Sequence, residues 1–154
     1  MNREELAELE SRLSLTLPEE YKGTVIRHPF PETGSYNYEL CGDYETLLEE
    51  NLGMRSEGFF GEQWNPTWFV IGTDGCGNNY FITTDPFDGN IYFADHEEKF
   101  HRSNLSGNFH YKSMDEFLRF LEETEKEIQE EELASESRIV NRSWWQFWIP
   151  RSSK

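Results

Sequence analysis

The chain has 154 residues, which suits one domain with a core of its own, and 16% of them are aromatic. Its 30 Asp and Glu residues outnumber 14 Lys and Arg, so the formal net charge is −16. Such a surface repels nucleic acid and anionic lipid and attracts basic partners, so we expect no direct nucleic-acid contact and do not favour membrane binding. The charged N-terminus lacks the apolar core of a signal peptide, and no apolar run approaches the about 20 residues that span a bilayer, so we expect a cytoplasmic protein.

The first 27 residues predict two helices. Asn2 can cap the first one, and Pro18 suits the start of a second, shorter helix for which Gly23 is a natural end. The first helix is amphipathic because its leucines recur at spacings of three and four. These residues are Leu6, Leu9 and Leu13.

A loop, a strand and a third helix are predicted next. Residues 28–35 contain two prolines and a glycine and indicate a loop, and the alternating tyrosines of residues 35–40 favour a short strand. Asp43 can cap a helix that ends near Gly53. An aromatic-rich loop follows over residues 57–67.

Three apolar runs then predict an antiparallel meander over residues 67–72, 79–84 and 90–96, joined by short turns. Ser113 and Glu116 fit the capping box of a long amphipathic helix. Its inner face comprises Met114, Phe117, Leu118, Leu121 and Ile128. The order of helices, meander and helix predicts a single α+β domain over residues 1–137, followed by a basic, Trp-rich tail over residues 138–154.

The turn TDGCGNN at residues 73–79 could bind a ligand or only reverse the chain. It has no lysine, and a strand rather than a helix follows, so it does not fit a phosphate loop. Its Asp74 and Asn78 do not follow the order of calcium ligands. We therefore favour a structural turn, in which Gly75 and Gly77 permit positive φ and Asp74 or Asn78 bonds the turn's own backbone.

Three segments together resemble the SUKH superfamily of bacterial immunity proteins and fungal cell-wall regulators. The run IGTDGCGNNYFITTDPFDGNIYFADHE is similar to its central strands and turns, ELESRLSLTLPEEYKG to its N-terminal helices, and SMDEFLRFLEE to its closing helix. The resemblance covers most of residues 5–125. Gly23 and the loop after it depart from the pattern, because many members continue a longer helix there.

The resemblance implies a curved, antiparallel-rich sheet packed with helices, no catalytic residues and no cofactor. It also implies an immunity protein that binds and neutralises a toxin, often a nuclease. The acidic composition agrees, since a nuclease holds nucleic acid with basic side chains that an acidic protein can cover. The alternative is a regulatory or scaffolding domain that binds a cellular protein. The sequence does not indicate the oligomeric state.

The candidate partner-binding residues lie on the turns of the meander and on the aromatic loop before it. The acidic candidates can equally be solvated surface charges, and the aromatic ones, together with Trp68, can equally belong to the core. The acidic candidates are Asp85, Asp88, Asp95, Glu97 and Glu98, and the aromatic ones are Phe59, Phe60 and Trp64.

No catalytic or metal site is predicted. His101 follows His96 by five positions, which is not the HExxH spacing, and the other histidines are His28 and His110. Cys41 and Cys76 form no metal or disulfide pattern. Cys76 could serve as a nucleophile, but a small buried side chain is the favoured interpretation.

The tail holds the anchor candidates Trp144, Trp145 and Trp148, flanked by Arg142 and Arg151. As a strand it would present two alternating apolar faces. Three roles remain open: it folds back over the domain, it inserts into a partner protein, or it lies at a membrane surface.

Overall fold

The structure is a computed structural model that describes residues 1–27, 39–97 and 110–146, apart from the side chains of residues 132 and 135–146. Two compact units are present, Met1–Leu121 and Glu122–Lys154. The predicted boundary at residues 137 and 138 stays a prediction. The helices are α1 (Arg3–Leu13), α2 (Glu19–Arg27), α3 (Tyr44–Glu57) and α4 (Met114–Gln146), and the strands are β1 (Trp68–Thr73), β2 (Asn79–Thr83) and β3 (Tyr92–Ala94). The α+β class is confirmed.

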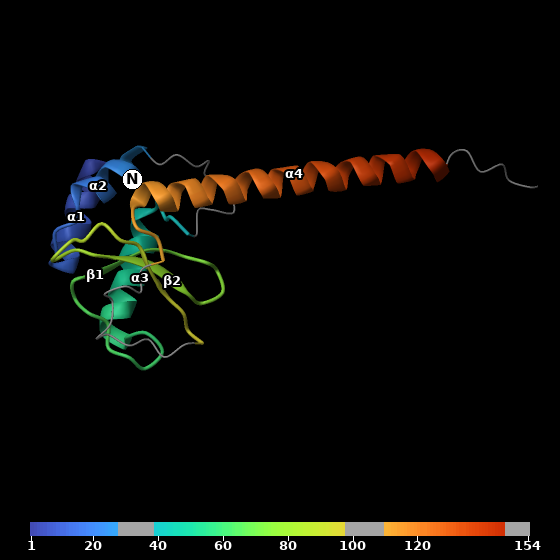
Figure 1. Cartoon of the computed structure of the whole chain (residues 1–154). Coiled ribbons are helices and arrows are strands. Elements are labelled where there is room, and N and C mark those ends of the chain that lie inside the picture. Colours follow the sequence, from blue (N-terminus) through green and yellow to red (C-terminus); the bar gives the residue numbers. More distant parts are fainter. Residues whose placement is uncertain (28–38, 98–109, 147–154) are drawn as a thin grey trace, which may run out of the picture. The chain divides into compact units, whose positions relative to one another are not determined.

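The three strands form the predicted antiparallel meander in the order β1-β2-β3 (Figure 1). Successive side chains of a strand point to opposite faces. Phe69, Ile71 and Ile82 join the core beneath the helices, and Trp68 and Phe81 join a second core on the other face. Burial of both faces explains why these strands have continuous apolar runs rather than an alternating pattern.

The first helix is capped as predicted. Asn2 Oδ1 accepts hydrogen bonds from the backbone N–H groups of Glu4 and Glu5, and the Glu5 carboxylate accepts one from Asn2. The end predicted for the second helix is wrong, because α2 continues through Gly23 to Arg27. A helical glycine costs about 1 kcal/mol, but the last turn buries Val25 completely, which returns about 1.5–3 kcal/mol.

Asp43 caps α3 as predicted, but the end predicted near Gly53 is wrong. The helix continues to Glu57 and thereby buries Met54 in the second core. The chain leaves the helix at Gly58, whose φ of 78° is open to glycine and costly for other residues.

Within α3, Asn51 is fully buried and completes the hydrogen bonding of β1. Its side chain accepts from the backbone N–H of Val70 at 2.8 Å and donates to the Val70 carbonyl at 3.0 Å. The pairing of β1 with β2 shifts register between Val70 and Gly72, where a bulge bends the strand. A helix side chain therefore hydrogen-bonds both backbone groups of Val70 in β1, which is an edge strand of the sheet.

The predicted cap of the last helix is confirmed in part. The backbone N–H of Glu116 donates to Ser113 Oγ, whereas the Glu116 carboxylate accepts from Lys112 rather than from Ser113. Met114, Phe117 and Leu121 are buried, but Ile128, predicted on the inner face, is 37% exposed. The part of the tail up to Gln146 is helical, because α4 continues to that residue.

Candidate binding site

A tight hairpin turn presents Phe60 to solvent. Phe59 and Glu62 exchange two backbone hydrogen bonds of 2.8 and 2.9 Å, so Phe60 and Gly61 are the two central residues of the turn. Their φ angles are 45° and 88°, the positive pair that defines a type I′ turn. Asn-Gly is the favoured sequence there, and an aromatic residue at positive φ is strained. Phe60 nevertheless occupies the position and is 68% exposed.

The hairpin stands on a packed aromatic base. Phe59 is buried and its ring centroid lies 6.2 Å from that of Trp64. Trp64 in turn packs edge-on against Trp68, at 5.2 Å, and its indole N–H donates to the Trp68 carbonyl. The core interpretation is therefore confirmed for Phe59, Trp64 and Trp68, and it is wrong for Phe60.

The glycine-rich turn between β1 and β2 is held by one carboxylate. Asp74 Oδ1 accepts from the backbone N–H groups of Cys76 and Asn78, and Oδ2 accepts from the Asn78 amide at 2.7 Å. Burial opposes ionisation of Asp74, but these hydrogen bonds outweigh it and hold its pKa below the ordinary value. The self-bonded turn is confirmed. The burial predicted for Cys76 is wrong, because the two positive-φ glycines around it turn its side chain outward to solvent.

His96 joins this turn to the Phe60 hairpin. Asn78 Oδ1 lies 2.8 Å from the backbone nitrogen of His96 and 2.6 Å from its Nδ1. The imidazole and the Phe60 ring are 5.3 Å apart between centroids. Three turns from separate parts of the chain thus meet, and we call Phe60, Asp74, Asn78 and His96 the three-turn site.

The structure separates the acidic residues predicted as one site. Asn79 pairs with Ala94, so the strand ends bring Asp95 and Glu97 to the same end of the sheet as the three-turn site. Asp85 and Asp88 lie in the turn at the opposite end, because that turn follows Thr83, the partner of Trp68. Glu98 lies outside the described residues, as do the side chains of Trp144, Trp145 and Trp148.

Several of these carboxylates also stabilise their own turns. Asp88 accepts hydrogen bonds from Asn90 and from the hydroxyls of Thr83 and Tyr92. Asp95 accepts one from the backbone N–H of Glu97. Sequence reasoning did not place Asp74, Asn78 and His96 in the site, although a hairpin register drawn for the meander would have brought residues 78 and 96 together.

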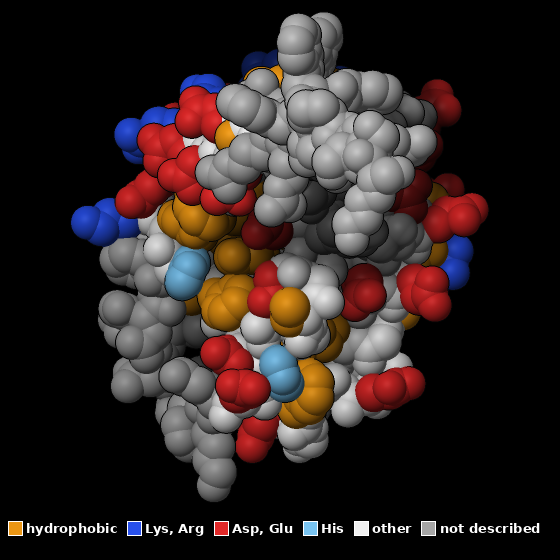
Figure 2. Space-filling model, turned by 90° about the vertical axis from the view of Figure 1, so that its right-hand side faces the viewer, with side chains coloured by type: hydrophobic (Ala, Val, Ile, Leu, Met, Phe, Trp, Pro, Cys, Tyr) orange, Lys and Arg blue, Asp and Glu red, His pale blue; other side chains and the backbone are white. Residues whose placement is uncertain are grey.

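The charge around these turns is strongly negative. Residues 1–121 contain 22 Asp and Glu against nine Lys and Arg. None of the ion pairs between described residues involves Asp85, Asp95 or Glu97. Figure 2 shows histidine and hydrophobic side chains among acidic ones on one face of the molecule, with lysine and arginine near its margin. A basic partner therefore meets carboxylates without losing an existing ion pair among the described residues.

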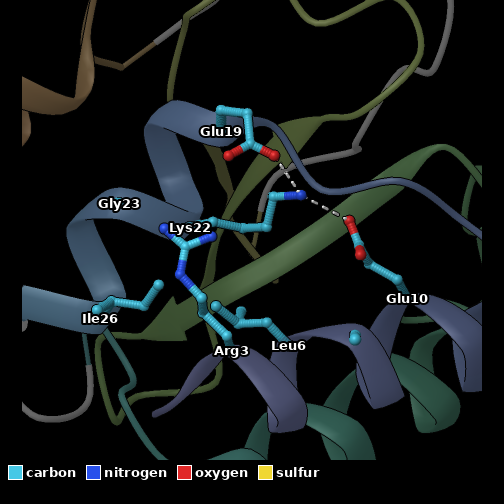
Figure 3. A pocket seen from close by; sticks show the side chains of 8 residues that line it. Arg3, Leu6, Glu10, Glu19, Lys22, Gly23 and Ile26 are labelled. Carbon is cyan, nitrogen blue, oxygen red and sulfur yellow. Dashed lines mark hydrogen bonds and ion pairs between the residues drawn. The ribbon is translucent and has the colours of Figure 1, made fainter.

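A hollow of about 220 Å³ lies between α1 and α2 (Figure 3). Lys22 Nζ stands 2.6 Å from a Glu19 oxygen and 3.2 Å from Glu10 Oε1. Glu10 also accepts from the backbone N–H of Leu17, so it fixes the turn between the helices. These charged groups satisfy one another, and we assign the hollow a structural role.

The described residues offer little for other chemistry. No group of three or more His, Cys, Asp or Glu side chains that could hold a metal ion occurs among them. Burial raises the pKa of the Cys41 thiol and lowers that of His110. His28 and His101 fall outside the described ranges. Within those ranges no helix is long and apolar enough to cross a membrane.

The family model of the SMI1 / KNR4 family (SUKH-1) matches residues 1–120. The chain belongs to this family. Its members are generally non-enzymatic immunity or regulatory proteins. Comparisons with curated proteins and with solved structures give no match. The match covers every strand and all of α1, α2 and α3, so the three-turn site lies within the family's domain.

Proposed function

We propose that this SUKH-1 protein is a non-enzymatic immunity protein that binds and neutralises a basic toxin domain, with Phe60 at the centre of the contact. The observation that carries the proposal is the Phe60 turn. A large aromatic side chain is 68% exposed at a φ of 45°, in a turn type that asparagine would fill with less strain. Strain at this position suggests a role in binding, since the contacts of the ring with Phe59 and His96 leave most of its surface in solvent.

The surroundings of Phe60 suit a protein partner. Aromatic anchors contribute most when a rigid base keeps them in place, because little side-chain freedom is lost on binding. Phe59 and Trp64 supply that base, and Asp95 and Glu97 supply negative charge beside it. The negative field speeds encounter with a basic surface, and the anchor slows its dissociation.

The matched substitutions are Phe60→Asn and Phe87→Asn. Asparagine tolerates the positive φ of position 60, so Phe60→Asn keeps the fold and removes only the ring. Phe87 is 36% exposed and lies in the turn at the opposite end of the sheet, so it controls for loss of an exposed aromatic side chain. Urea denaturation should show that Phe60→Asn is at least as stable as the natural chain.

The functional test captures partners from the cells that make the protein, in about 50 mM and about 500 mM salt, which bracket weak and strong screening. We expect one basic domain, toxic when expressed alone, whose toxicity is relieved by co-expression of the natural chain or Phe87→Asn. We expect at least about tenfold weaker capture by Phe60→Asn, since an anchor contributes about 2 kcal/mol. Unchanged capture would contradict the role of Phe60. A non-toxic cellular protein as partner would favour a regulatory or scaffolding domain instead.

A further inference from the structure

The hydrogen bonds of the three-turn site determine which nitrogen of His96 carries a proton. The ionised Asp74 carboxylate only accepts hydrogen bonds, so the Asn78 group that lies 2.7 Å from it is the donating Nδ2. The backbone N–H of His96 can only donate, so its partner is the accepting Asn78 Oδ1. Both contacts give the same orientation of the amide.

The same Asn78 oxygen lies 2.6 Å from His96 Nδ1. Because that oxygen can only accept, Nδ1 must carry the proton. In the neutral imidazole, Nε2 is then an acceptor. No hydrogen bond between described residues uses Nε2 of His96. The site thus holds a hydrogen-bond acceptor next to an exposed aromatic ring.

We propose that His96 Nε2 and the ring of Phe60 together bind the guanidinium group of an arginine side chain on the partner. The arrangement supplies both contacts that this group makes best: a plane to stack on and an acceptor for one N–H. The two ring centroids are 5.3 Å apart and the rings are inclined by 37°, so the imidazole lies directly beside the ring on which the guanidinium would stack. That the arginine belongs to a toxin rests on the proposed function, whereas the recognition of the guanidinium does not.

The charges near the site favour a cation over other ligands. Asp95 and Glu97 flank His96 in the chain, and Asp74 lies one hydrogen-bonded residue away. An anionic ligand would be repelled, and lysine offers no plane to stack on Phe60. Among the described residues His96 belongs to no group of three metal ligands, so we do not propose a metal ion.

The test is NMR spectroscopy on the full-length, ¹³C,¹⁵N-labelled protein, with Nα-acetyl-arginine methylamide as the probe. The matched control is the citrulline analogue, which keeps the planar end group but loses its charge, with chloride equalised. The spectra are recorded at a pH of about 8, which is above the ordinary pKa of an imidazole, about 6.5. Two-bond ¹H–¹⁵N correlations then report the tautomer directly. We expect a proton on Nδ1 of His96, and saturable shifts of His96 Nε2 and the Phe60 ring that are at least about twofold larger with arginine than with citrulline.

The inference is overturned by a proton on Nε2, by equal shifts with arginine and citrulline, or by equal shifts with the lysine analogue. Phe60→Asn should reduce the arginine-induced shift of His96 by at least about twofold, since stacking on the ring is lost. If arginine does not shift Nε2 but Phe60→Asn abolishes capture of a toxin, the proposed function stands and this inference fails. If arginine binds but no toxin is captured or neutralised, this inference stands and the proposed function fails.

Discussion

Replacement of Asn51 by leucine tests how β1 is held. Asn51 is 0% exposed and Val70 is 1% exposed, and both backbone groups of Val70 are satisfied by the Asn51 amide. Leucine has a similar size and keeps the helix but can neither donate nor accept. The Val70 N–H and C=O would then be buried without a partner among the described residues.

The expected loss follows from these contacts. Each unsatisfied buried group costs about 1–3 kcal/mol, which gives about 2–6 kcal/mol for the two groups. The leucine side chain returns about 1–2 kcal/mol through apolar burial. We therefore expect Asn51→Leu to lower the free energy of unfolding by about 3 kcal/mol. With a urea dependence of about 1–3 kcal/mol per molar, the midpoint falls by at least about 1 M.

The assay is urea denaturation followed by the fluorescence of the buried Trp64 and Trp68. Glu49→Leu is the control, because it places the same side chain on an exposed position of the same helix and should change stability by less than about 0.5 kcal/mol. Hydrogen exchange at the Val70 amide should accelerate more than exchange elsewhere in β1. A loss below about 1 kcal/mol for Asn51→Leu would refute the reasoning that this amide completes the strand.

Two further predictions concern the ends of α3. Gly58→Ala should destabilise the fold by more than about 2 kcal/mol, because the added Cβ would lie 2.3 Å from the Glu62 carbonyl oxygen and the backbone φ is 78°. Gly53→Ala should stabilise the fold by about 0.5–1 kcal/mol, because no heavy atom lies within 4 Å of the added Cβ. Thermal unfolding of the two variants tests both expectations. Hydrogen bonds from the Thr46 backbone N–H and hydroxyl lower the pKa of Asp43. Its ionised form therefore stabilises the fold above the unfolded-state pKa of about 3.9, and this contribution is lost as the pH falls through the folded-state pKa. Asp43→Asn keeps a capping oxygen, so its stability deficit should shrink as pH falls from 7 to about 2 in denaturant titrations, and a constant deficit would count against this account.

Local sequence patterns were sufficient for the elements and for several of their contacts. The caps at Asn2 and Asp43, the three strands and the Asp74 turn depend on residues close together in the chain. The hydrogen bonds of the caps and of the turn involve neighbours in the chain, and the strands are marked by their apolar runs, so residue type and spacing predict these elements. The α+β class followed from the order of these elements, and the family resemblance followed from the same residues.

Only the tertiary structure decided where helices end and which side chains meet. Gly23 and Gly53 lie within helices because burial of Val25 and Met54 outweighs the local preference of glycine to end them. Phe59 and Phe60 are adjacent and chemically identical, yet one is buried and the other exposed, because the hairpin turns between them. His96 and Phe60 are 36 residues apart in the chain, and their rings meet only because the folded sheet and the Phe60 hairpin pack together, which no local pattern contains.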